Sequence, residues 1–250
     1  MRALKQLILP VFIISIYLVV CRFDLVSSYL VPRPQKIAGA LLLMLRDGSL
    51  AHHIAVSFQR VCKGFLITTG VAVPLALLFY FIPPISRYFL GSLHFLRSIP
   101  PLAMVPLLIL WFGIGEASKL AIIILASFFP VFLNTLSGLQ QVDPKLLEMG
   151  RTLELGRGEQ IINILLPESL PTVLTGLRLA FGYSWRALIG AEMIAASSGL
   201  GYMILDAEEL ARTDKVYIGI LTIGTLGLLL DIVSMKYLQW KFPWMKSEAS

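Results

Sequence analysis

Six long apolar runs constrain what this chain can fold into more than any other feature of its sequence. They cover residues 4–21, 61–82, 101–115, 118–138, 171–195 and 216–235. A transmembrane helix needs about 20 consecutive apolar residues, and each run reaches or approaches that length. Charged residues make up 14% of the 250 residues, whereas a typical soluble domain has about 25%. We therefore predict an all-α membrane protein with about six transmembrane helices.

The third run and three prolines interrupt the regularity of these spans. The run at 101–115 is short, and we expect its polar flank to run obliquely. Pro74, Pro106 and Pro130 lie inside predicted spans, where a proline removes a backbone hydrogen bond and kinks the helix. Such kinks are typical of a moving, solvent-lined bundle, but also of membrane helices in general.

The amino-terminal run has the shape of a secretory signal peptide, since Arg2 and Lys5 precede apolar residues 7–20. Small residues are missing before Cys21, where a cleavage site would need them. We therefore expect an uncleaved first helix, followed by an outer loop. Within that loop, residues 37–45 carry apolar side chains at helical spacing, which predicts an amphipathic helix along the outer surface.

Positive charges orient the chain only weakly, because Lys and Arg residues are nearly balanced between the two predicted sides. Lys236, Lys241 and Lys246 lie close to the carboxyl terminus and favour a cytoplasmic tail over residues 241–250. We therefore expect both termini in the cytoplasm.

Nucleic-acid binding, metal binding and ATP hydrolysis find no support in the sequence. The net charge of +6 is scattered between apolar runs instead of forming a basic tract. Cys21 and Cys62 make no CxxC motif, and the histidines at 52, 53 and 94 fall in predicted loops. His52 and His53 are neighbours, about 100° apart on a helix, and cannot chelate one metal ion. No Gly-x-x-x-x-Gly-Lys-Ser/Thr loop is present, so we expect no metal and no cofactor on this chain.

The polar segment between the fourth and fifth spans, residues 141–170, is itself patterned as helix. Asp143 is a good N-cap and Pro144 a good first-turn residue. An apolar stripe then follows at Leu146, Leu147, Gly150 and Leu153. Gly156 and Gly158 predict a break before a second apolar stretch. Such a helix either fits a groove on a soluble partner or lies flat at the lipid headgroups.

This segment resembles the cytoplasmic coupling loop of binding-protein-dependent ABC importer permeases, whose pattern is Glu-Ala-Ala, then Gly, then Ile-x-Leu-Pro. The pattern maps onto Glu148, Met149, Gly150, Glu154, Ile164, Leu166 and Pro167. Met149 and Gly150 replace the two alanines, and Glu154 replaces the glycine. The resemblance implies that contacts to an ATPase are made by Glu148, Met149, Gly150, Arg151, Thr152, Glu154 and Gly156.

The similarity extends over residues 55–235, and segments 98–116 and 177–204 are similar to the nitrate, sulfonate and taurine branch of that family. It implies a type I importer permease fold with an N-terminal helix and outer loop (1–55), a permease core (56–240) and a cytoplasmic tail (241–250). It also implies a translocation subunit that is not itself an enzyme, in a bacterial inner membrane. The implied partners are a second copy of the permease, two cytoplasmic ATPases that carry ATP and Mg, and an external solute-binding protein.

The solute and its pathway are predicted less directly. Arg186, Trp185 and Glu192 lie in or near the fifth span and are our candidates for the pathway, since a charge at membrane depth is expensive. Arg186 also fits a snorkelling role. The resemblance favours a small organic anion such as an aliphatic sulfonate, with nitrate and taurine as alternatives. An ion-coupled secondary transporter and an intramembrane enzyme are the rival classes.

Overall fold

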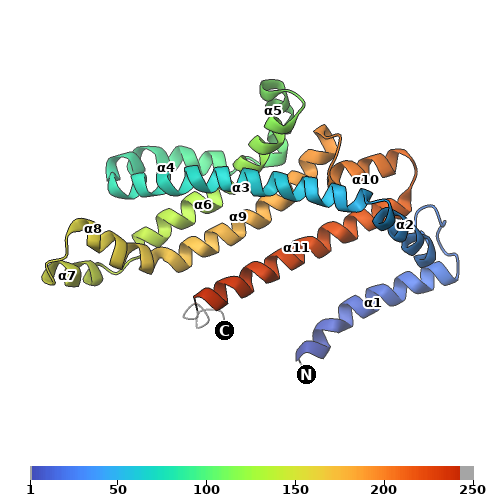
Figure 1. The fold of residues 1–250 in the computed structure, drawn as a ribbon, viewed down its shortest axis with the longest axis horizontal. Coiled ribbons are helices and arrows are strands. Elements are labelled where there is room, and N and C mark those ends of the chain that lie inside the picture. The colour runs from blue at the N-terminus through green and yellow to red at the C-terminus, as the bar shows by residue number, and fades with distance from the viewer. Residues whose placement is uncertain (1, 243–250) are drawn as a thin grey trace.

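The computed structural model describes residues 2–242, without the side chains of residues 2–7 and 10, and the described chain is helical with no strand. The elements in order are α1 (Arg2–Arg22), α2 (Pro34–Arg46), α3 (Ser49–Phe81), α4 (Pro83–Arg97), η1 (Pro101–Met104), α5 (Val105–Phe112), α6 (Glu116–Gln140), α7 (Pro144–Thr152), α8 (Arg157–Gln160), η2 (Ile161–Leu165), α9 (Leu166–Ala195), α10 (Leu200–Glu209) and α11 (Thr213–Lys241). Figure 1 shows their arrangement. The all-α prediction is confirmed. The predicted tail 241–250 lies, beyond Phe242, outside the described residues.

Four helical segments of the described chain are long and apolar enough to cross a membrane: α3, α6, α11 and the continuous segment Arg157–Ala195. The pair Pro83–Arg97 and Pro101–Phe112 passes the same test as one broken span. A shorter apolar helix covers Val11–Arg22. Each of the six predicted runs thus falls on helix.

The prediction of a single span at 101–115 with an oblique flank was wrong in form. Residues 83–97, expected to be a connection, form α4, and the helix pair bends by 85° between Arg97 and Pro101. The bend has a local cause, because Pro100 adopts an extended conformation with φ −61° and ψ 129° and is followed by a second proline. Pro106 lies in the first turn of α5 and does not kink a helix interior. Pro74 and Pro130 do lie inside helices, as predicted.

Close packing of α6 against α9 forms the centre of the bundle. A Cβ atom on Gly176 would lie 2.4 Å from Asn134 Cβ and 3.0 Å from the Pro130 carbonyl oxygen. Gly138 faces α9 in the same way, 3.0 Å from the Ser169 carbonyl oxygen. These glycines let the two backbones approach closely.

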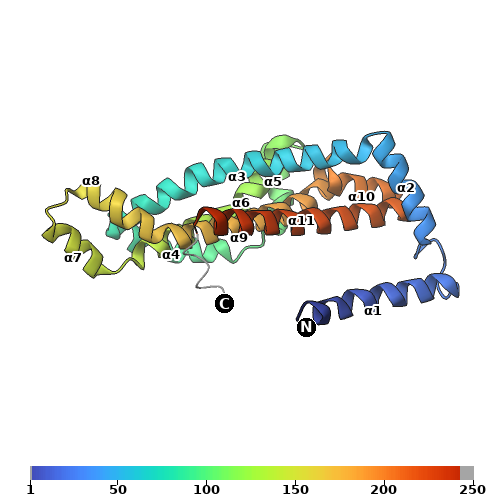
Figure 2. The ribbon, with the colours of Figure 1, turned by 60° about the horizontal axis from the view of Figure 1, so that its bottom comes forward.

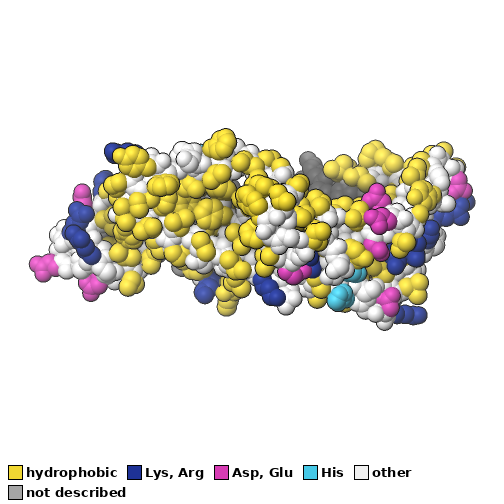
Figure 3. All heavy atoms as spheres, turned by 90° about the horizontal axis from the view of Figure 1, so that it is seen from above, with side chains coloured by type: hydrophobic (Ala, Val, Ile, Leu, Met, Phe, Trp, Pro, Cys, Tyr) yellow, Lys and Arg dark blue, Asp and Glu magenta, His cyan; other side chains and the backbone are white. Residues whose placement is uncertain are grey.

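The molecule is elongated, with α7 and α8 at one end and α2 and α10 at the other (Figure 1). Figure 3 shows hydrophobic side chains along the flank, and charged side chains mainly at the two ends. Helix α1 runs apart from the bundle in Figure 1 and Figure 2. The Tyr17 hydroxyl donates to the Pro32 carbonyl at 2.6 Å, which joins α1 to the loop before α2. Apolar side chains along α1, such as Phe12 and Ile14, are exposed, as a lipid-facing helix requires.

The amphipathic helix predicted over 37–45 is confirmed as α2. Ala40 and Met44 are buried, and Ile37 and Leu41 pack beside them against the end of the bundle. Leu45, which the prediction placed on the same stripe, is exposed.

Candidate functional site

Arg186 lies well inside α9 with its guanidinium partly unsatisfied. Its Nε donates to the Gly182 carbonyl oxygen at 3.2 Å, and its Cζ lies 5.1 Å from the centre of the Tyr183 ring. No carboxylate of a described residue forms an ion pair with it. An exposed charge within a membrane span must face water, an anion or another protein surface, because facing lipid is costly.

A cavity of about 560 Å³ lies beside Arg186, between the bend after α4 and the facing sides of α6 and α9. Its charged lining residues are Arg97 and Arg186, and no Asp or Glu lines it. Asn134 and Tyr183 add an amide and a hydroxyl. Apolar side chains make up most of the remaining wall, including Leu125, Phe129, Leu133 and Leu179. A cavity of this size and lining suits a small solute with an anionic end.

Trp185 lies on the other side of α9 and does not line this cavity. It is 4% exposed, and its Nε1 donates to the Ile223 carbonyl oxygen on α11 at 3.3 Å. A second cavity of about 310 Å³, between α9 and α11, is lined by Trp185 and also by Arg186. The ion pair between Arg178 and Asp231 lies at this cavity, with Nε 2.8 Å from Oδ1.

Glu192 is fully buried and has protein partners on both carboxylate oxygens. Arg60 Nη1 on α3 donates to Oε1 at 2.7 Å, and Ser57 Oγ lies 2.8 Å from Oε2. The backbone N–H of Gly201, in the first turn of α10, donates to Oε2 at 3.0 Å. The Glu192 carboxylate also lies at the amino end of α10, where the helix dipole stabilises a negative charge. A pathway role for Glu192 stays a prediction, and in this structure the residue holds α9, α3 and α10 together.

Arg60 extends this ion network to α6. Its Nε and Nη2 donate to the two carboxylate oxygens of Glu116 at 2.8 and 2.7 Å. Lys119 Nζ donates to Glu116 Oε1 at 2.9 Å, and Ser198 accepts from Arg60 through its carbonyl oxygen. Two cations and two anions therefore balance within this network.

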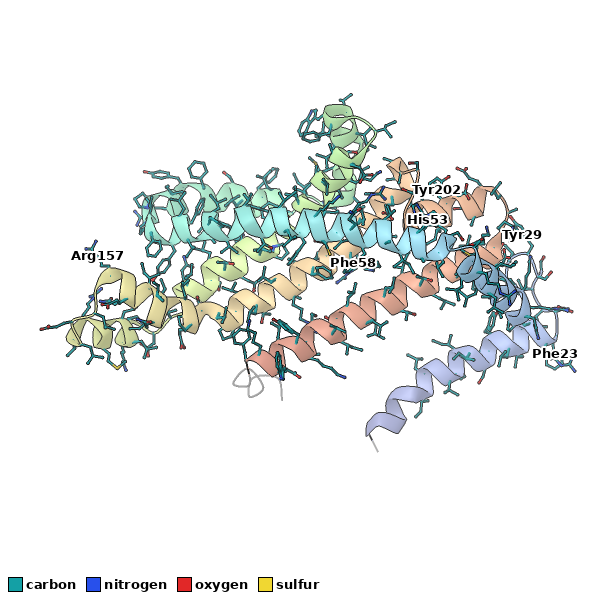
Figure 4. All side chains as sticks on the ribbon, in the orientation of Figure 1. Phe23, Tyr29, His53, Phe58, Arg157 and Tyr202 are labelled. Carbon is teal, nitrogen blue, oxygen red and sulfur yellow. The ribbon has the colours of Figure 1, made fainter. Side chains whose placement is uncertain are left out.

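Apolar run length did not predict this network, because Arg60 falls directly before the run at 61–82, at the flank of the predicted outer loop. The sequence feature that could have indicated the network is an arginine directly before the span at 61–82, together with acidic residues near the ends of other spans. The histidine prediction was also wrong, because His52 and His53 lie in the first turns of α3 and His94 lies in α4. His53 Nδ1 accepts the Gly199 N–H at 3.1 Å. Figure 4 shows His53 near Tyr202 on α10, with ring centres 6.2 Å apart.

The predicted helix after residue 143 is α7, and its cap is as expected. The Asp143 carboxylate accepts the Lys145 N–H at 2.9 Å, and Pro144 opens the first turn. Leu147 packs into a small core with Leu139, Val142 and Leu165. That core fixes α7 as an arm at the tip of the molecule, where Arg157 on α8 is labelled in Figure 4.

The predicted coupling residues occupy two different environments. Glu148, Met149, Arg151, Thr152, Glu154 and Gly156 are exposed. Gly150 is buried, and a Cβ there would lie 2.7 Å from Ile164 Cδ1. Gly150 therefore lets α7 pack on the returning chain and does not itself present a surface. Leu153, exposed by 64%, joins Met149, exposed by 52%, as an apolar group at the tip.

Glu154 replaces the glycine of the family pattern, and it nevertheless forms the turn at the end of α7. Its φ is +57°, in the left-handed region that glycine favours. The Leu155 N–H donates to the Gly150 carbonyl oxygen at 3.0 Å, which closes α7 with the bond of a helix C-cap. The expected break at Gly156 and Gly158 therefore comes earlier. Gly156 has an ordinary φ of −60° and instead begins α8, where its N–H donates to Glu159 Oε2 at 2.8 Å.

Comparison with known proteins places this arrangement in context. The family model described as the binding-protein-dependent transport system inner membrane component matches residues 64–239. The chain is 39% identical over 242 residues to the putative aliphatic sulfonates transport permease protein SsuC of Bacillus subtilis (strain 168), covering 95% of this chain and 88% of that protein. It is 32% identical to the taurine transport system permease protein TauC of Escherichia coli (strain K12), covering 93% and 86%.

A nitrate import permease protein, NrtB of Leptolyngbya laminosa, is 32% identical and covers 74% of this chain and 66% of that protein. Among solved structures, an amino acid ABC transporter crystallised with histidines superposes with a TM-score of 0.66 at 14% identity, covering 79% of this chain and 96% of that chain. The fold is therefore shared with ABC importer permeases, even where the sequence has diverged.

Proposed function

The chain belongs to the binding-protein-dependent transport system inner membrane component family, in the branch of sulfonate, taurine and nitrate permeases, and we propose that it moves a small organic anion inward by ATP-driven alternating access. The observation that supports an anionic solute is the environment of Arg186. Its guanidinium lies inside the α9 span, in a cavity whose walls are mostly apolar, and has no carboxylate partner among the described residues.

Arg186 suits a small oxyanion because a guanidinium offers parallel N–H donors to two acceptor oxygens. Apolar walls from Leu125 and Phe129 accommodate a short alkyl body. We therefore favour an aliphatic sulfonate, and nitrate, taurine or another small solute are the alternatives.

The proposed assembly contains two copies of this chain, two cytoplasmic ATPases and an external solute-binding protein. The second copy is favoured by the polar groups exposed along α9 and α11. Arg186 would meet lipid if this face were bare, at a cost of about 3 kcal/mol for an unpaired charge, and the Arg178–Asp231 ion pair would lie on the same bare face. A facing permease and a water-lined pathway remove that cost. The exposed tip at Met149 and Leu153 is the proposed contact to the ATPase.

The partner proposal is tested by purification in mild detergent from native membranes. A soluble ATPase is expected to co-purify in equal amount with this chain. A secondary transporter would instead purify without an ATPase, and its vesicles would take up solute on an ion gradient without ATP.

The solute proposal is tested in vesicles that contain the whole complex and its binding protein, with ethanesulfonate as the probe. Arg186→Gln should lower ethanesulfonate uptake at least about tenfold and leave basal ATPase activity near wild type, because one charged hydrogen-bond donor set is lost. Arg87→Gln is the matched control, since Arg87 is an exposed arginine on α4 that lines neither cavity. Equal uptake by the Arg186 variant would reject the contact.

A further inference from the structure

A second arginine reaches the cavity that Arg186 lines. Arg97 is the last residue of α4, directly before the bend at Pro100 and Pro101. It is exposed and forms no hydrogen bond or ion pair with a described residue. The 85° bend turns the chain so that Arg97 and Leu102 both face the wall formed by α6 and α9.

The two guanidiniums make this cavity cationic with no acidic counterpart. None of the residues that line it is Asp or Glu. Asn134 lines the cavity with a neutral amide, whose Nδ2 donates to the Pro130 carbonyl oxygen at 2.8 Å. Like charges that share a cavity with apolar walls repel each other unless an anion lies between them.

The rest of the described lining has no anionic group to pair with a second, positive charge on the solute. Leu125, Phe129, Leu133 and Leu179 offer only apolar contact. An ammonium group on the solute would lose its hydration, find no carboxylate among the described residues that line the cavity and face two arginines. An uncharged alkyl group has no such cost of dehydration and is stabilised by apolar contact with the same wall.

We infer that Arg97 and Arg186 together hold the head group of one organic anion, and that this pair makes the cavity select anions with an uncharged body against zwitterions. This inference rests on the proposed function. A sulfonate has three acceptor oxygens, so two can accept from one guanidinium while the third accepts from the other. A carboxylate has only two oxygens and one guanidinium satisfies both, so Arg97 contributes less to a carboxylate.

The test uses two sulfonates that differ by one ammonium group. Ethanesulfonate has a two-carbon alkyl body, and taurine carries an ammonium group on the end of the same two-carbon body. Equilibrium binding of each is measured on the purified permease and ATPase complex without the solute-binding protein, so that selection by that protein does not contribute. Wild type should bind ethanesulfonate at least about tenfold tighter than taurine.

Variants then separate the two arginines. Arg97→Gln and Arg186→Gln should each weaken ethanesulfonate binding at least about tenfold, Arg97→Lys should weaken it less, and Arg87→Gln should bind as wild type. Wild-type binding by Arg97→Gln, equal binding of taurine, or no binding of either probe to wild type would overturn the inference. In those cases ATP-dependent ethanesulfonate uptake by the whole complex would still support the proposed function, whereas ATP-independent uptake would reject the proposed function itself.

Discussion

The Nη1 atom of Arg60 on α3 lies 2.7 Å from Oε1 of Glu192 on α9, and the two side chains are 7% and 0% exposed. The pair is 132 positions apart in the chain. It lies where α3, α9 and the start of α10 meet, and Glu116 extends it to α6. An ion pair this deeply buried is strongly coupled, because neither charge can recover hydration if the other is removed.

Removing Arg60 alone should destabilise the protein severely. Arg60→Met leaves the Glu192 carboxylate buried without its cation, and we expect a loss of about 3–5 kcal/mol. Thermal unfolding of the detergent-purified protein measures the loss. Arg33→Met is the control, because the Arg33 and Asp24 pair is exposed by 59% and 63% and should contribute about 0–1 kcal/mol.

The double variant Arg60→Met with Glu192→Met should recover part of that stability, because it removes both buried charges. A double variant no more stable than Arg60→Met alone would contradict the pairing energetics argued here.

Gly199→Ala should also destabilise the α10 end of the molecule. Gly199 has a φ of +119°, and a Cβ there would lie 2.2 Å from Glu192 Oε1. The backbone strain alone costs about 1–3 kcal/mol, and displacement of the carboxylate adds to it. Gly70→Ala is the matched control, since a Cβ at that helical position meets nothing within 4 Å. Equal melting temperatures for the two variants would show that the loop relaxes at no cost.

Glu154→Gly should stabilise the coupling loop. Glu154 holds a φ of +57°, which costs a residue with a side chain about 1 kcal/mol more than glycine. Glu154→Val should destabilise the coupling loop relative to wild type, because a β-branched residue tolerates this backbone region poorly. Melting temperatures of the two variants should therefore move in opposite directions. If Glu154→Gly lowers uptake without lowering stability, the carboxylate itself contacts the ATPase.

Substitutions on α7 should separate coupling from folding. Met149→Asp places a charge on an exposed apolar side chain, so it should leave the melting temperature unchanged and reduce co-purification of the ATPase. Glu148→Arg should likewise leave the melting temperature unchanged, and it should uncouple solute uptake from ATP hydrolysis. Gly150→Trp differs, since its side chain collides with Ile164, and it should lower stability as well as uptake.

Gly158→Asp is the control for Met149→Asp. It adds the same charge in the same loop, where a Cβ meets nothing within 4 Å and no contact to the ATPase is predicted. Normal ATPase binding by the Met149 variant would reject the tip of α7 as the contact.

The expected orientation is tested by cysteine labelling in a background that lacks Cys21 and Cys62. A cysteine at Lys145 or Gly158 should react with an impermeant reagent only from the cytoplasmic side, and one at Glu208 only from outside. All three positions are exposed, so reagent access depends on the side and not on burial. Labelling of position 145 from outside would reverse the orientation.

The sequence by itself determined the features that depend on local spacing. Apolar run length gave the spanning helices, and helical spacing of apolar residues located α2 and α7. The N-cap at Asp143 followed from residue type and position alone. These features are readable because hydrogen bonds within a helix and its apolar face involve residues three or four apart.

The tertiary structure decided which charges face the cavity and which are buried. Glu192 and Arg186 lie six residues apart on one helix and looked alike as pathway candidates. Arg60 from α3 neutralises Glu192, whereas Arg186 has no carboxylate partner among the described residues. The bend after α4 brings Arg97 to the same cavity as Arg186. Long-range pairing of this kind has no local signal, because the energy of a charge at membrane depth depends on the partners that distant segments bring to it.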